Sequence, residues 1–152
     1  VETEAYFGKG DPASRASRKR TRLNELMWWR GGLAFVYMVH ANWMFNATTE
    51  REGVPGAVLI RAVQPLEGAE LMGRRRGVDD ERKLASGPGR MTQALGIDKG
   101  HHKLDLTRSR ELRIVEGKPL DFKVETSHRI GVTRDMEREL RFYVRGNPFV
   151  SK

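Results

Sequence analysis

The chain has 152 residues, of which 38% are apolar and 16 are glycines, so its composition is that of one globular domain and excludes a disordered or collagen-like chain. Cysteine is absent, which excludes disulfides, thiolate nucleophiles and cysteine-based zinc sites, and no run approaches the roughly 18 apolar residues of a membrane span. The 28 basic residues against 20 acidic ones give a formal net charge of +8, which suits a polyanion such as nucleic acid, although a basic soluble protein with no such partner remains an alternative.

Strand patterns dominate the N-terminal part of the chain. Residues 1–6 alternate in polarity, and the basic stretch 14–22 lacks a helical period, so we interpret it as a solvated loop. The apolar runs 33–39 and 43–48 lie close enough together to predict a hairpin. A nearly all-apolar run predicts a further strand over 56–63.

The middle of the chain changes to helical patterns. Residues 66–84 carry helix-forming residues, with breaks predicted at Gly73 and Gly77, and a second helix is predicted over 89–95. Residues 101–110 are polar and predicted to be irregular. Short strands are predicted in the last third, at 112–115, at 122–124, and from 140 to a turn at 146–148.

The order of these elements argues for the α+β class rather than a doubly wound fold. We expect a single domain over residues 1–152, with a curved, mostly antiparallel sheet and a few helices packed around it. The chain opens directly in a strand and does not begin with Met. We therefore expect that an N-terminal segment has been lost or left out.

Few residues carry a recognisable chemistry, since no phosphate-binding loop, zinc helix or nucleophile elbow is present. Glu4 and Tyr6 are two apart in a predicted strand and so share a face, which is either a base beside a stacking platform or an ordinary half-buried strand. Tyr37 alternates with Phe35, a pattern typical of core packing. Arg61 lies within an apolar strand, where a guanidinium is costly unless paired, and Glu4 is a candidate partner.

The chain resembles the single-domain alkyladenine, or 3-methyladenine, DNA glycosylases. Motifs similar to those of that family follow one another in its order through nearly all of the chain: Val-Glu-Thr-Glu-Ala-Tyr at 1–6, Asp-Pro-Ala-Ser at 11–14, Phe-Val-Tyr at 35–37, Trp-Met-Phe-Asn at 43–46, Val-Leu-Ile-Arg-Ala at 58–62, Ser-Gly-Pro at 86–88, Gln-Ala-Leu at 93–95 and Arg-Phe-Tyr-Val-Arg-Gly at 141–146. The segment that usually precedes the first motif is absent, which agrees with the expected truncation.

The resemblance implies a role for each matching residue. Glu4 corresponds to the general base that deprotonates the attacking water, and Arg61 to the arginine that helps to hold this water. Tyr6 and Tyr37 correspond to aromatics on either side of the flipped base. Asn46 corresponds to the asparagine that obstructs the 2-amino group of guanine. The resemblance implies no cofactor and no metal.

Two residues depart from the family pattern. Arg15 stands where most members have a histidine against the base, and His40 stands where the intercalating aromatic usually lies. The basic residues expected to contact DNA phosphates are Arg18, Lys19, Arg20, Arg22 and Arg145.

The resemblance thus implies a monofunctional hydrolase that removes alkylated or deaminated purines from double-stranded DNA without cleaving the strand, as the first step of base-excision repair. We expect an intracellular monomer, in the cytoplasm with the nucleoid or in a nucleus, and no membrane partner. Two alternatives stay open: a catalytically impaired DNA- or RNA-binding domain on the same scaffold, and a basic structural protein.

Overall fold

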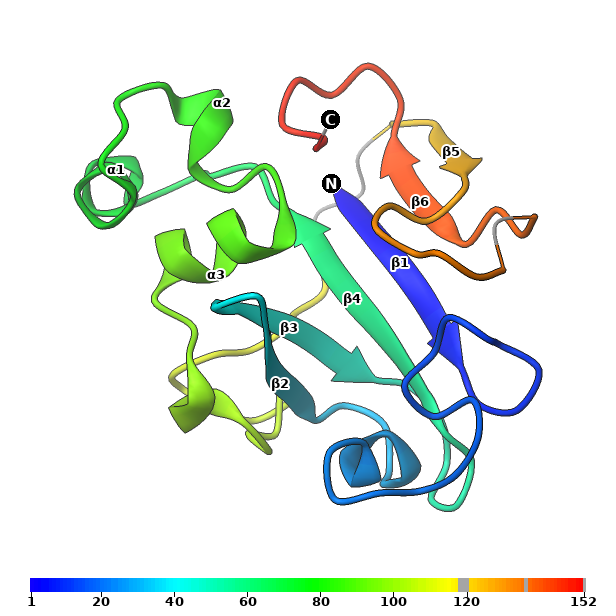
Figure 1. Cartoon of the computed structure of the whole chain (residues 1–152). Coiled ribbons are helices and arrows are strands. Elements are labelled where there is room, and N and C mark those ends of the chain that lie inside the picture. Colours follow the sequence, from blue (N-terminus) through cyan, green and yellow to red (C-terminus); the bar gives the residue numbers. More distant parts are fainter. Residues whose placement is uncertain (118–120, 136, 152) are drawn as a thin grey trace.

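A single antiparallel sheet organises the molecule in the computed structural model, which describes residues 1–117, 121–135 and 137–151 (Figure 1). Within these ranges six strands follow the spatial order β2-β3-β4-β1-β6-β5, and every neighbouring pair is antiparallel. The strands are β1 (Glu2–Phe7), β2 (Ala34–Val39), β3 (Asn42–Thr48), β4 (Gly56–Ala62), β5 (Val124–Ser127) and β6 (Arg141–Val144). The predicted α+β class is confirmed.

The predicted hairpin joins β2 to β3 through a two-residue turn. Val39 pairs with Asn42, and the turn residues His40 and Ala41 have φ values of 45° and 61°. Positive φ at both central positions matches the twist of the two strands, because it is the geometry of a type I′ turn. The turn therefore presents His40, exposed, at the tip of the hairpin.

Within the described ranges, three helices lie on one side of the sheet: α1 (Ala69–Arg76), α2 (Glu81–Leu84) and α3 (Pro88–Leu95) (Figure 1). Of these, α3 packs directly against β3 and β4, and the other two pack against α3. Proline is favoured in the first turn of a helix, where α3 has Pro88, and Gly96 ends this helix with a φ of 71°. Buried side chains from α2 and α3, among them Met91, pack against Val36 and Phe45 of the sheet.

The opposite face of the sheet is covered by the long segment between β1 and β2. This segment includes the short 3-10 helix η1 (Glu25–Trp28), and its Leu26 and Met27 pack on Phe35 and Ala57. Successive residues of β2 thus point to opposite layers. No helix of the described ranges is long and apolar enough to cross a bilayer.

Three predicted elements are wrong in part or in full. Residues 112–115 form no strand, and the strand expected at 122–124 lies instead at Val124–Ser127. A short apolar run forms a strand only where it pairs with another strand, and in this part of the chain it is Val124–Ser127 that pairs with β6. The predicted break at Gly73 is also wrong, because a glycine within a helix costs only about 1 kcal/mol and α1 continues through Gly73 to Arg76; the predicted break at Gly77 is confirmed.

Candidate active site

Glu4 lies in the middle of the sheet and is fully buried. Its Oε1 accepts a hydrogen bond from the backbone amide of Ile130 at 2.7 Å and lies 3.2 Å from Nη1 of Arg61. Its Oε2 accepts a hydrogen bond from the Tyr6 hydroxyl at 2.8 Å. A carboxylate has about four acceptor positions, so these three contacts leave room for one further donor. The predicted shared face of Glu4 and Tyr6 is confirmed.

A β-bulge places Arg61 beside this carboxylate. The register between β1 and β4 shifts by one residue between Glu2 and Thr3, and Arg61 is the extra residue. The predicted pairing with Glu4 is confirmed, but Arg61 also donates from Nε to Oε1 of Glu2 at 2.9 Å. The arginine therefore bridges two buried carboxylates.

Glu2, which the sequence analysis missed, is held by several donors. Its carboxylate accepts hydrogen bonds from Nε of Arg141 at 2.7 Å and from the backbone amide of Ser151 at 2.6 Å. Burial would raise the pKa of Glu2, but the hydrogen bonds from Arg141 and Ser151 outweigh this effect and hold the pKa below its ordinary value. Glu2 therefore stays charged and keeps Arg61 in place.

Arg129 was also missed, and it joins the loop after β5 to β1. Its fully buried side chain donates to both carboxylate oxygens of Asp11, at 2.9 and 2.7 Å, and to the carbonyl of Ala5 at 2.9 Å. Its guanidinium carbon lies 4.6 Å from the centre of the Tyr6 ring. Burial opposes the charge of Asp11, but the hydrogen bonds from Arg129 prevail and lower its pKa. This clamp positions the neighbouring Ile130, whose amide reaches Glu4.

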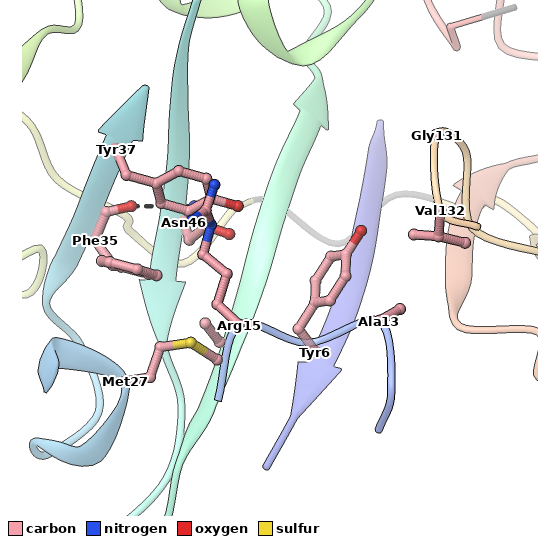
Figure 2. Close-up of a pocket in the computed structure, with 10 residues that line it drawn as sticks. Tyr6, Ala13, Arg15, Met27, Phe35, Tyr37, Asn46, Gly131 and Val132 are labelled. Carbon is pink, nitrogen blue, oxygen red and sulfur yellow. Dashed lines mark hydrogen bonds between the residues drawn. The ribbon is translucent and has the colours of Figure 1, made fainter. Parts of the chain in front are cut away.

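A cavity of about 240 Å³ lies on the sheet face that is covered by the β1–β2 segment (Figure 2). It brings together four of the residues predicted to bind a base: Tyr6, Arg15, Tyr37 and Asn46. The remaining wall is apolar or backbone, from Ala13, Met27, Phe35, Ala57, Gly131 and Val132. Glu4 lies behind Tyr6, so the Tyr6 hydroxyl links the cavity wall to the buried carboxylate.

The surroundings of two lining residues set the orientation of the Asn46 amide and the protonation state of the Tyr6 hydroxyl. Asn46 is buried and donates from Nδ2 to the carbonyl of Phe35 at 3.1 Å, as the dashed line in Figure 2 marks. Burial, and then the charge of Glu4, raise the pKa of the Tyr6 hydroxyl, which therefore remains protonated at neutral pH and able to donate.

The basic residues divide into separate groups. Arg18 and Lys19 line a shallow groove of about 310 Å³ that also includes Arg15, and the neighbouring Arg20 and Arg22 are exposed. Arg145 is separated from this groove in the order of the strands, because it follows β6. There it forms an ion pair with Glu125 at 3.1 Å. Among the described residues, no cluster of three His, Asp or Glu side chains could hold a metal ion.

Comparison with known proteins identifies the family. Residues 1–148 match the model of the methylpurine-DNA glycosylase family. Several relatives are named "Putative 3-methyladenine DNA glycosylase". That of Mesorhizobium japonicum is 44% identical over 99% of this chain and 73% of its own length. That of Aeropyrum pernix is 43% identical over 100% of this chain and 75% of its own length. The relative of the same name from Chlorobaculum tepidum is 41% identical over 100% of this chain and 73% of its own length. The chain therefore belongs to the methylpurine-DNA glycosylase family, and the expected class, a hydrolase of the DNA glycosylase type, is confirmed at the level of the family.

Proposed function

We propose that this protein hydrolyses the N-glycosidic bond of alkylated or deaminated purines that have been flipped out of duplex DNA into the cavity between Tyr6 and Tyr37. The observation that carries the proposal is the buried Glu4 carboxylate, which is joined by a hydrogen bond to an aromatic residue of the cavity wall. The aromatic side chains of the cavity offer a binding surface for a planar base, and the buried Glu4 carboxylate behind Tyr6 offers a proton acceptor.

Binding of the base follows from the cavity wall. Extruding a base from a duplex costs a few kcal/mol, and stacking on aromatic side chains returns about 1–3 kcal/mol per base. Methylation at a purine ring nitrogen such as N7 leaves the base with a positive charge, which gains roughly 0.5–2 kcal/mol over an electron-rich ring. Tyr6 and Tyr37 both line the cavity and are the residues we assign to this role. Asn46, held by Phe35, is assigned to the exclusion of the guanine amino group.

Hydrolysis follows from the surroundings of Glu4. A water molecule in the remaining acceptor position of Glu4 gives up a proton to the carboxylate as its oxygen bonds to C1′, while the C1′–N bond breaks and the base leaves with the bonding electrons. The negative charge of Glu4 also stabilises the oxocarbenium-like transition state. Arg61, which the bulge and Glu2 hold in place, is assigned to positioning this water. We expect no strand cleavage, since this chemistry uses water and not an amine as nucleophile.

Contact with DNA is assigned to the basic loop and the hairpin tip. Arg18, Lys19, Arg20 and Arg22 contact phosphates in this proposal, and His40 enters the duplex from the tip of the type I′ turn. Arg145 is assigned a more distant phosphate, and binding of DNA releases it from Glu125.

The Glu4→Gln variant tests the proposal. Its amide keeps the shape of the carboxylate but cannot accept the proton, so single-turnover release of base from methylated duplex DNA falls by about 10²–10⁴-fold. The abasic product is measured by alkaline strand scission. The affinity for the same duplex, measured by fluorescence anisotropy, stays within about twofold because Glu4 lies behind the cavity wall.

Glu52→Gln is the matched control, since Glu52 is exposed, and it leaves base release unchanged. Excision by Glu4→Gln within tenfold of the unaltered protein would remove Glu4 as the base. If the unaltered protein binds damaged duplex but produces no abasic sites, the alternative of a catalytically impaired binding domain holds instead.

A further inference from the structure

Arg15 occupies the part of the cavity where a base would stack. Its guanidinium carbon lies 4.1 Å from the centre of the Tyr37 ring, and in the view of Figure 2 its side chain extends across the cavity from the segment that carries Ala13. Any base that stacks on this face of Tyr37 must either displace the guanidinium or lie against it. Arg15 therefore either competes with the ligand for the Tyr37 ring or contacts the ligand directly.

The position of Arg15 in the fold is fixed although its side chain is exposed. Its neighbours Ser14 and Ala16 are buried, at 5% and 2% exposure. Its carbonyl accepts a hydrogen bond of 2.7 Å from Nδ2 of the buried Asn24. The side chain consequently starts from a rigid point within reach of Tyr37.

The charge of Arg15 is not neutralised nearby. It is the one charged side chain among the described residues that line the cavity, and within that part of the chain no carboxylate forms an ion pair with it. The charged residues beside it in the adjacent groove, Arg18 and Lys19, carry the same sign. Glu4, the carboxylate behind the cavity wall, is already engaged by Arg61. The cavity therefore presents a positive charge to its ligand.

From these observations we propose that Arg15 is a specificity-determining residue that disfavours bases carrying a positive charge relative to neutral bases with hydrogen-bond acceptors. The inference rests on the proposed function only in taking a flipped base as the ligand. A neutral base with carbonyl or ring-nitrogen acceptors can lie against the planar guanidinium and receive hydrogen bonds from it. A cationic base that stacks against the guanidinium brings a like charge to within a stacking distance of about 4 Å, and has to displace it.

The expected size of this discrimination is about fivefold, which corresponds to about 1 kcal/mol. This is roughly a quarter of the interaction of two unit charges at 4 Å in a medium of dielectric constant near 20, the rest being lost to screening and to movement of the exposed side chain. The effect is a ratio between two ligands, so a general loss of affinity does not mimic it.

The test compares duplexes that contain, at one position, either 7-methylguanine as the cationic base or hypoxanthine as the neutral one. Both are built on 2′-fluoro sugars, whose glycosidic bond resists hydrolysis, and their dissociation constants are measured by fluorescence anisotropy. The affinity ratio of cationic to neutral base rises about fivefold in Arg15→Gln and stays within twofold of the unaltered protein in Arg15→Lys, which keeps the charge. Arg18→Gln, the groove control, weakens both duplexes equally.

An unchanged ratio in Arg15→Gln overturns the inference, and so does an equal rise in Arg15→Lys, because the effect would then come from packing and not from charge. Excision of the same bases on ordinary sugars is measured separately. If the unaltered protein excises neither base, the proposed function is refuted. The affinity ratio still decides the role of Arg15 in that case, because it is measured without excision.

Discussion

Replacing Arg129 by Met removes the charge that compensates the fully buried Asp11 while keeping most of the side-chain volume. In the folded protein Asp11 would retain hydrogen bonds from the amides of Phe7 and Ala13, at 2.9 and 3.2 Å, and an ion pair with Arg138 at 3.3 Å. Removing one partner of a buried ion pair costs about 3–5 kcal/mol, and these remaining contacts place the cost near the lower limit. Total stability is about 5–15 kcal/mol for a domain, so the loss is large.

Urea unfolding followed by tryptophan fluorescence measures this loss directly. A cost of about 3 kcal/mol corresponds to a fall in Tm of roughly 6–12 °C for a domain of this size. Arg138→Met is the matched control, since Arg138 contacts the same carboxylate but is 39% exposed, and it costs less than about 1 kcal/mol. Equal costs for the two variants would refute the reasoning. Adding Asp11→Asn to Arg129→Met recovers part of the loss, because no uncompensated charge then remains.

Two further predictions concern DNA binding and acid stability. Affinity for DNA falls with salt, and the simultaneous substitutions Arg20→Ala and Arg22→Ala make this dependence less steep. The magnitude of the slope of log affinity against log salt concentration decreases by about 2, because two phosphate contacts are lost. An unchanged slope in anisotropy titrations would exclude this part of the loop from the interface. Burial raises the pKa values of Asp11 and Glu2, but hydrogen bonds from Arg129 and Arg141 prevail and hold both below their ordinary values. Their contribution to the free energy of unfolding is therefore complete above the ordinary carboxyl pKa of about 4 and is lost as the pH falls through the lower folded values. Urea titrations across this range show the fall, and Asp11→Asn makes it shallower.

Local patterns predicted the elements that depend on neighbouring residues. Alternation identified β1, the paired apolar runs identified the hairpin, and the Pro88–Leu95 helix was predicted to within one residue because its apolar face and flanking glycines are contiguous in the chain. The same argument correctly gave Arg61 a buried carboxylate partner, since an arginine in an apolar strand is costly without one.

The parts that the sequence did not predict depend on contacts between distant segments. Arg129 and Ile130 lie in an irregular loop with no periodic pattern, and their contacts with Asp11 and Glu4 span 118 and 126 residues. Glu2 was overlooked because the bulge that brings Arg61 to it follows from the pairing of β1 with β4, which no local pattern specifies. The strand expected at 112–115 failed for the same reason, since apolar content alone does not supply a partner edge.

The place of β1 in the sheet also has a consequence for how the chain folds. β1 precedes the other described strands in sequence but lies between β4 and β6, and the amide that completes the surroundings of Glu4 comes from 126 residues further on. During synthesis, Glu2 and Glu4 stay in water until β6 and the loop after β5 have emerged, because burying unpaired carboxylates is strongly unfavourable. Contacts between such distant residues slow folding relative to a helical bundle, because the entropy of closing long loops is lost before these contacts form. Until then one edge of β1 remains open to pairing with other chains, and the hydrated charges of Glu2 and Glu4 on that strand disfavour such pairing.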